Sequence, residues 1–119
     1  MFKITKKFEC CLGHFLEGLP STHPCSMVHG HNYVITVELS SNKLNSTGFV
    51  VDYRELEAIK KWIDGNMDHK MLNSVFLFNP TAENIAKHLY DTFKDLYPEL
   101  TAVEVSETPK TNARYEPEQ

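Results

Sequence analysis

The sequence predicts an α+β fold, in which a four-stranded antiparallel sheet carries two helices on one face. Three observations predict it. Segments with the character of strands lie at both ends of the chain, two amphipathic helical patterns lie between them, and no repeat or linker interrupts the 119 residues. Strands that precede and follow helices in separate runs are typical of α+β domains. We therefore expect a single domain over residues 1–119.

The N-terminal half should supply the first strands of the sheet. Residues 2–11 mix apolar and polar side chains without proline or glycine, which favours a strand. Residues 13–24 are rich in glycine and proline and are expected to form a loop. A second strand is expected over about 31–41, followed by turn residues. Residues 49–51 are then expected to form a short strand that ends at Asp52.

A first helix is expected over about residues 53–66. Asp52, followed three residues later by Glu55, resembles a capping box with aspartate as the cap. Apolar residues then recur at helical spacing, which predicts an amphipathic helix; they are Leu56, Ile59, Ile63 and Met67.

A second helix and two closing strands should follow. Asn79 and Pro80 offer a cap residue and a first-turn proline, and the helical pattern stops before Pro98. Residues 101–107 alternate well enough for a strand, and residues 112–116 can return as the last one. A small sheet of this kind leaves both edges open. Because open edges pair readily with other chains, oligomerisation is expected.

Composition narrows the class of partner. A net charge of −4 argues against nucleic acid or an anionic membrane as the main partner, and no apolar run is long enough to span a membrane. The chain holds three cysteines, of which Cys10 and Cys11 are adjacent, and these make a poor disulfide framework. A reducing cytoplasm is the expected setting, and there Cys25 can act as a free thiolate.

The segment from Cys25 to Tyr33 predicts a metal site. His29 and His31 are two residues apart at the start of an expected strand, so their side chains project from the same face. Cys25 is nearby, and His14 and His23 lie in the preceding expected loop. Imidazole nitrogens suit zinc, and three protein ligands with one open position describe a catalytic site. The alternative is a structural zinc closed by Cys25 and three histidines.

Two further groups are candidates for chemistry. Asp68 precedes His69 directly, and a carboxylate near an imidazole can fix its tautomer in an acid–base relay. Glu107 follows Val103 and Val105 at strand spacing, so it points where the apolar side chains point. A carboxylate aimed inward needs a hydrogen-bond donor or a ligand.

Together these residues resemble the 6-pyruvoyltetrahydropterin synthase family. The resemblance covers about residues 2–116 and rests on six motifs in order, which are residues 8–14, Cys25-x-x-x-His29-Gly30-His31, Val51-Asp52-Tyr53, Met67-Asp68-His69, Asn79-Pro80-Thr81-Ala82-Glu83-Asn84 and Val105-Ser106-Glu107-Thr108. It implies the tunnelling fold (T-fold), in which sheets join through their edges into a β-barrel, as a homo-oligomer of four or six subunits.

The resemblance also implies roles for the site residues. It implies zinc (Zn²⁺) held by His14, His29 and His31. It identifies Cys25 as the general base, with Asp68 and His69 as relay partners. Glu107 is then the anchor that accepts two hydrogen bonds from a pterin, and Thr81 belongs to the same pterin pocket.

The spacing between Cys25 and His29 indicates the branch of the family. The short Cys-x-x-x-His-Gly-His motif is similar to the bacterial 6-carboxytetrahydropterin synthases of queuosine biosynthesis. These lyases are expected to convert 7,8-dihydroneopterin triphosphate to 6-carboxytetrahydropterin, acetaldehyde and triphosphate. The first alternative is a pyruvoyltetrahydropterin synthase, which eliminates triphosphate without breaking the carbon skeleton. The second is a non-enzymatic zinc protein that binds a pterin.

Overall fold

The computed structural model of the protein describes residues 1–27 and 29–118, and for His29 and His31 it describes the backbone alone. The elements follow in the order β1 (Phe2–His14), η1 (Pro24–Ser26), β2 (His29–Ser41), η2 (Tyr53–Leu56), α1 (Glu57–Asn66), α2 (Leu72–Val75), α3 (Ala82–Phe93), β3 (Leu100–Thr108) and β4 (Thr111–Tyr115). Within the described residues, no helix has the length and apolarity needed to cross a membrane.

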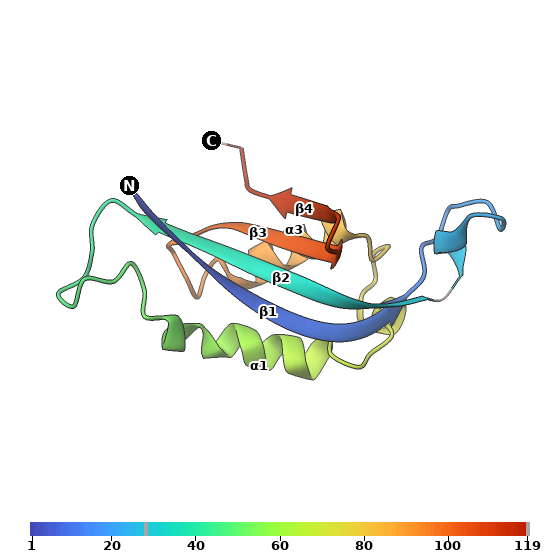
Figure 1. Ribbon diagram of the computed structural model, residues 1–119, viewed down its shortest axis with the longest axis horizontal. Helices are drawn as coiled ribbons and strands as arrows, with labels where there is room; N and C mark the ends of the chain where they lie inside the picture. Colours follow the sequence, from blue (N-terminus) through green and yellow to red (C-terminus); the bar gives the residue numbers. More distant parts are fainter. Residues whose placement is uncertain (28, 119) are drawn as a thin grey trace.

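The four strands form one antiparallel sheet in the order β1-β2-β3-β4. β1 and β2 pair along their whole length, from Phe2 opposite Ser41 to His14 opposite His29. This long ribbon accounts for the elongated outline of the molecule, which measures 55 × 29 × 26 Å. Helix α1 runs beside β1, and α3 lies behind β3 and β4 (Figure 1). The predicted α+β class, with its four antiparallel strands, is confirmed.

The face of the sheet that meets the helices is apolar because residues alternate along each strand. Four successive inward positions of β2 have no solvent exposure; they are Tyr33, Ile35, Val37 and Leu39. Ile59 and Ile63 of α1 and Leu89 of α3 are buried in the same core. One of the inward residues, Tyr33, carries a hydroxyl group, which therefore needs a polar partner inside the protein.

Two predicted boundaries at the start of the chain are wrong. β1 continues to His14, so the glycine at position 13 lies in the strand and not in a loop, and β2 begins at His29 instead of about residue 31. Pairing with β2 extends over Gly13 and Gly30, and the backbone N–H of Gly13 donates to the carbonyl of Lys70. These contacts between distant segments, which local composition does not reveal, keep the strand extended to its end.

The predicted short strand over residues 49–51 does not form. The Asn45 side-chain oxygen accepts hydrogen bonds from the backbone N–H groups of Thr47, Gly48 and Phe49, at 3.0, 3.1 and 2.9 Å. An asparagine side chain that accepts from three successive backbone N–H groups folds the segment into a local turn. These N–H groups are then not available for pairing with a strand.

The helix starts agree with the prediction in part. The Asp52 side chain accepts from the N–H of Arg54, as expected of a cap, but it begins the short 3₁₀ helix η2, and α1 follows. The cap of α3 is Thr81, whose hydroxyl oxygen accepts from the N–H of Asn84, and the prediction of Asn79 is wrong. Asn79 instead pairs its amide with both backbone groups of Glu17. The helix ends at Phe93, and the short helix α2 was not predicted.

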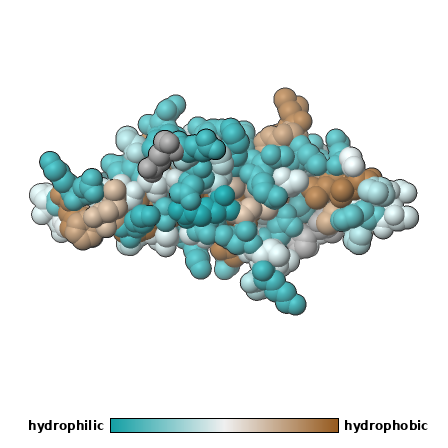
Figure 2. All heavy atoms as spheres, turned by 90° about the horizontal axis from the view of Figure 1, so that it is seen from above, coloured by the Kyte–Doolittle hydropathy of each residue, from teal (hydrophilic) through white to brown (hydrophobic). Residues whose placement is uncertain are grey.

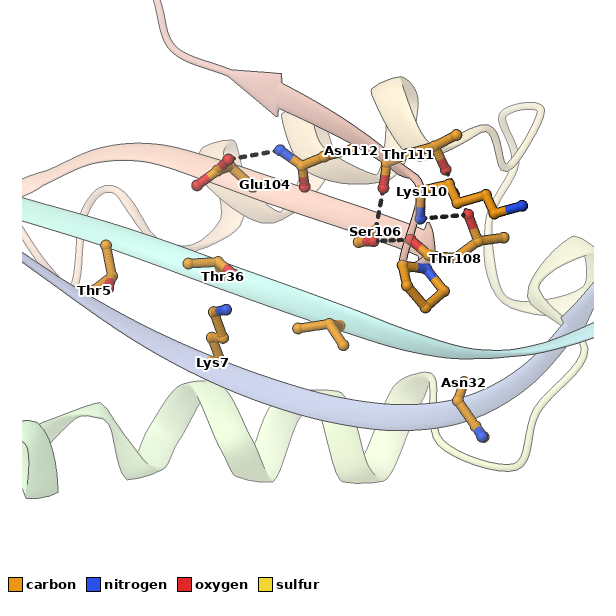
Figure 3. A pocket seen from close by; sticks show the side chains of 12 residues that line it. Thr5, Lys7, Asn32, Thr36, Glu104, Ser106, Thr108, Lys110, Thr111 and Asn112 are labelled. Carbon is orange, nitrogen blue, oxygen red and sulfur yellow. Dashed lines mark hydrogen bonds between the residues drawn. The ribbon is translucent and has the colours of Figure 1, made fainter.

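The opposite face of the sheet is polar and hollowed. Thr5 and Lys7 of β1, Thr36 of β2, and Glu104 and Ser106 of β3 line a depression of about 590 Å³ there (Figure 3). Figure 2 shows a surface on which hydrophilic side chains predominate and hydrophobic ones form separate patches. The two faces of the sheet thus differ in character, as alternation along the strands requires.

An ion pair on this polar face makes a pH-dependent contribution to stability. Arg114 reaches from β4 to Glu38 of β2 at 2.7 Å, and the Thr101 hydroxyl donates to the same carboxylate at 2.9 Å. Burial raises the pKa of Glu38, but the hydrogen bonds from Arg114 and Thr101 outweigh it and lower the pKa below the ordinary value. Because the folded pKa is depressed, the stabilisation is complete above the unfolded pKa of about 4.3 and is lost as the pH falls through the folded value.

Replacing Glu38 with glutamine should therefore lower the free energy of unfolding at about pH 6 more than at about pH 3. Urea unfolding of both proteins at the two pH values measures the difference. A destabilisation of equal size at both would contradict the role given to the ion pair.

Candidate active site

His14 is the last residue of β1 and the one fully buried polar residue in the described part of the chain. Its Nδ1 lies 2.9 Å from the carbonyl oxygen of Pro80, just before α3. A carbonyl can only accept, so Nδ1 carries the proton and donates it there. This bond fixes the tautomer and leaves Nε2 with its lone pair, as in histidines that bind metals through Nε2.

The backbone register brings the three predicted zinc ligands to one end of the β1–β2 ribbon. His14 lies opposite His29, and Leu12 lies opposite His31. Directly opposed residues of an antiparallel pair share a face, so positions 14, 29 and 31 belong to one face. The side chains of His29 and His31 lie outside the described residues, and the described side chains alone include no cluster of three metal-binding groups.

Tyr33 interacts with two of the predicted site residues, and its role was not predicted from the sequence. The residue is fully buried, and its hydroxyl oxygen lies 2.9 Å from Nε2 and 3.1 Å from Nδ1 of His14. The two rings meet edge to face, with their centroids 5.5 Å apart. Burial raises the pKa of Tyr33, and the charge of Glu107 and a hydrogen bond to its carboxylate raise it further. The hydroxyl therefore stays protonated at neutral pH and acts as a donor.

A signal for Tyr33 was present in the sequence. It alternates with Ile35, Val37 and Leu39, and a phenol on an otherwise apolar strand face must find a polar partner. Which partner it finds depends on the tertiary structure.

Glu107 lies near the end of β3, at the rim of a hollow of about 350 Å³. Val105, Ala82 and Glu83 at the start of α3, and Asn112 of β4 also line this hollow. The Glu107 carboxylate contributes to the raised pKa of Tyr33 through its charge and a hydrogen bond, which is the kind of donor that an inward carboxylate was expected to need. Thr81 directly precedes Ala82, which lines the hollow. The Thr81 hydroxyl caps α3 by accepting from the N–H of Asn84 at 3.1 Å.

Cys25 lies in the 3₁₀ turn η1, within the connection from β1 to β2. It is a free, partly exposed thiol. The His23 Nδ1 atom accepts from the Cys25 N–H at 3.0 Å, and the N–H of Leu16 donates to the Cys25 carbonyl at 2.7 Å. Cys25 is also among the groups whose charge raises the pKa of Tyr33.

Asp68 and His69 occupy the outer edge of β1. Asp68 Oδ1 accepts from the N–H of Cys11 at 2.9 Å, and the N–H of His69 donates to the Cys11 carbonyl at 2.6 Å. These bonds hold His69 at a φ of 57°, a left-handed conformation that non-glycine residues rarely adopt. The turn brings His69 Nε2 within 3.5 Å of Asp68 Oδ2 and leaves the imidazole 78% exposed.

The fold thus places the predicted site residues in two groups. His14 and Glu107 both interact with Tyr33, whereas Asp68 and His69 contact the edge strand, and Cys25 lies in the turn η1 between β1 and β2. None of the contacts found among the described residues joins His69 to Cys25 or Glu107.

Comparisons with known proteins identify the family of the chain. The profile of the family "6-pyruvoyl tetrahydropterin synthase" matches residues 3–118. The chain belongs to this family. A relative from Synechocystis named 6-carboxy-5,6,7,8-tetrahydropterin synthase is 35% identical, with 97% of this chain and 93% of the relative aligned. A relative of the same name from Rickettsia felis is 32% identical over 84% of this chain and 83% of its own.

A solved structure of 6-pyruvoyl tetrahydropterin synthase from Caenorhabditis elegans has a TM-score of 0.85 and 25% identity, and covers 98% of this chain and 96% of its own. As a member of this family, the protein has the T-fold that the sequence analysis expected.

The donor set at this end of the sheet fits a zinc ion. His14 donates from Nδ1 to the Pro80 carbonyl, which is the orientation of histidines that bind a metal through Nε2, and a carbonyl of this kind is a common partner of such ligands. Register adds positions 29 and 31 on the same face. Three imidazoles would leave a fourth position open for substrate.

Proposed function

We propose that this protein is a zinc-dependent 6-carboxy-5,6,7,8-tetrahydropterin synthase, a lyase that acts on 7,8-dihydroneopterin triphosphate in queuosine biosynthesis. One observation carries the proposal: the buried Tyr33 hydroxyl interacts with both the predicted metal ligand His14 and the predicted pterin anchor Glu107. A base, a metal ligand and an anchor are the groups this reaction needs. The names of the curated relatives support the same product.

Glu107 would bind the pterin ring. Its carboxylate borders the hollow beside α3 and can accept two parallel hydrogen bonds, from the amino group and a ring nitrogen. This bidentate contact would set the orientation of the ring and so direct the rest of the substrate towards Cys25 and His14. Thr81 would shape the pocket through its cap of α3.

Cys25 would act as the general base. Its thiolate would take a proton from a carbon in the substituent of the pterin, and the turn that holds its backbone at both N–H and C=O would keep it in place. His14, His29 and His31 would hold zinc. When bound, zinc would supply a Lewis acid that makes the C–H bonds of this substituent more acidic.

Asp68 and His69 would complete the site of a neighbouring subunit. Both are hydrogen-bonded to Cys11 at the outer edge of β1, which is an edge strand of the sheet, and His69 is exposed. Because open edges are expected to pair in a homo-oligomer, the imidazole of one subunit can come beside the thiol of the next. There it would pass protons during loss of triphosphate and cleavage of the carbon skeleton.

Product analysis tests the proposal. The purified protein, loaded with zinc, is incubated with 7,8-dihydroneopterin triphosphate, and acetaldehyde and 6-carboxytetrahydropterin are measured. We expect both in equal amounts. Triphosphate release without acetaldehyde would overturn the assignment, as would turnover that is unchanged after chelation and full removal of the metal.

The second candidate is a 6-pyruvoyltetrahydropterin synthase. The fold match to the Caenorhabditis elegans protein of that name favours it. The same residues would then eliminate triphosphate and leave the three-carbon substituent whole. The absence of acetaldehyde, together with formation of the pyruvoyl product, would identify this activity.

A further inference from the structure

Two asparagine side chains hold the chain just after His14. The Asn73 amide accepts from the N–H of Phe15 and donates to the carbonyl of the same residue, both at 2.9 Å. The Asn79 amide contacts Glu17 in the same way, at 2.9 and 3.1 Å. An amide that bonds both polar groups of one residue takes the place of a neighbouring strand, so these residues are held as if β1 continued past its end.

The two asparagines extend a row of contacts along the outer edge of β1. Every second residue from Cys11 to Glu17 is hydrogen-bonded to the segment 68–79. The first two of these residues lie within β1, and the asparagines hold the other two beyond it. Because alternate residues of a strand direct their backbone groups to opposite edges, the backbone of Leu16 is directed away from the asparagines.

Leu16, the residue between the two held positions, is attached to Cys25. Its N–H donates to the Cys25 carbonyl at 2.7 Å. All other hydrogen bonds that residues 20–26 make with described residues join them to one another or to Met27. The bond from Leu16 therefore ties the turn of Cys25 to the end of β1, and it depends on the asparagines that hold the residues on either side.

The asparagines are themselves fixed by the rest of the fold. Asn73 lies in α2, next to Leu72, which is fully buried in the core. The carbonyl of Asn79 accepts from the N–H of Thr81 at 2.8 Å and from the side chain of Asn84 at 3.0 Å. Side chains that are fixed in this way can keep another group in place with precision.

We propose that Asn73 and Asn79 are positioning residues, which place the Cys25 thiol against the substrate by holding the segment attached to it. The inference rests on the proposed function, in which Cys25 is the general base, and it names what keeps that base in place. A displacement of about 1 Å at a reacting group is enough to cost on the order of 10²-fold in rate. A base on a long connection between two strands therefore needs such support.

The test compares the turnover of dihydroneopterin triphosphate by Asn73→Ala, Asn79→Ala and the control Asn45→Ala. Asn45 also holds backbone N–H groups, but its turn lies at the opposite end of the molecule from the connection that carries Cys25 (Figure 1). We expect kcat to fall about 10- to 100-fold in the first two variants and less than about twofold in the control. KM, zinc content and the affinity for unsubstituted pterin should change less than about twofold in all three.

A double-variant cycle shows whether the effect passes through the thiol. If Asn73 acts by placing Cys25, Asn73→Ala should lower the residual turnover of Cys25→Ala by less than about twofold. Alkylation by iodoacetamide, followed by mass spectrometry, should modify Cys25 at least as fast in Asn73→Ala as in the wild type, because the thiol is displaced but intact. Asn73→Asp replaces the alanine variant if that does not fold. It keeps the acceptor for the Phe15 N–H and loses only the donor, so kcat should fall severalfold.

The inference is overturned if kcat stays within about twofold in both asparagine variants, or falls by the same factor with and without Cys25. It is also overturned if the alkylation rate falls with kcat, or if lost zinc or pterin binding accounts for the change. These results leave the proposed function intact. A wild type that forms no acetaldehyde, or full turnover by Cys25→Ala, would instead overturn the proposed function and the inference with it.

Discussion

Replacing Cys25 with alanine is expected to reduce turnover of dihydroneopterin triphosphate by about 10²–10⁴-fold, the usual cost of losing a general base. The thiol lies in a turn fixed by backbone hydrogen bonds, so its removal should leave the local conformation intact. Zinc content and the free energy of unfolding should match those of the wild type. Steady-state kinetics, metal analysis and urea unfolding measure these three properties.

The same variant separates a catalytic zinc site from a structural one. If Cys25 were a fourth zinc ligand, its loss would lower both metal content and stability. Cys11→Ser is the matched control, because Cys11 is also a free thiol, and its side chain is exposed. Full turnover by Cys25→Ala with zinc retained would disprove the role of general base.

Mixing two inactive variants is expected to restore activity if the relay acts between subunits. Cys25→Ala lacks the base, and His69→Asn lacks the imidazole. Asparagine tolerates the left-handed backbone of position 69 better than most residues, so the turn should survive. In oligomers re-formed from an equal mixture, about a quarter of the sites would combine an intact thiol with an intact imidazole, as random assembly of a symmetric oligomer requires.

The recovered activity should therefore approach about a quarter of the wild-type value per site. The control is the double variant, with both changes in one subunit, mixed with Cys25→Ala, which leaves no intact thiol in any site. Activity that does not rise above that of the separate variants would show that Cys25 and His69 act within one subunit.

Much of the fold could be predicted from local patterns. Alternation along β2 and β3 and the helical spacing of Leu56, Ile59 and Ile63 each report which face of an element is buried, and the structure confirms these faces. The wrong predictions occur where a contact between residues distant in sequence determines the local structure. Asn79 has the chemistry of a helix cap, but its amide pairs with the backbone of Glu17, and Thr81 takes the cap.

The candidate site was likewise predictable only in part from the sequence. Spacing was enough to propose His29 and His31 as a pair, because side chains two apart on a strand share a face. Spacing did not indicate a role for Tyr33. Its importance comes from interactions with His14, 19 positions away in the sequence, and with Glu107, 74 positions away. Nor could it show that Asp68 and His69 bind to the outer edge of β1.

By itself, the sequence determined the fold class, the family and the residue types available for chemistry, because periodicity and motif spacing are local properties of the polypeptide. Only the tertiary structure decided which of those residues meet. The register of β1 against β2 brings His14 opposite His29, the Pro80 carbonyl sets the tautomer of His14, and the buried phenol of Tyr33 links His14 to Glu107. These contacts join residues far apart in sequence, and they form only when the sheet and the helices pack together.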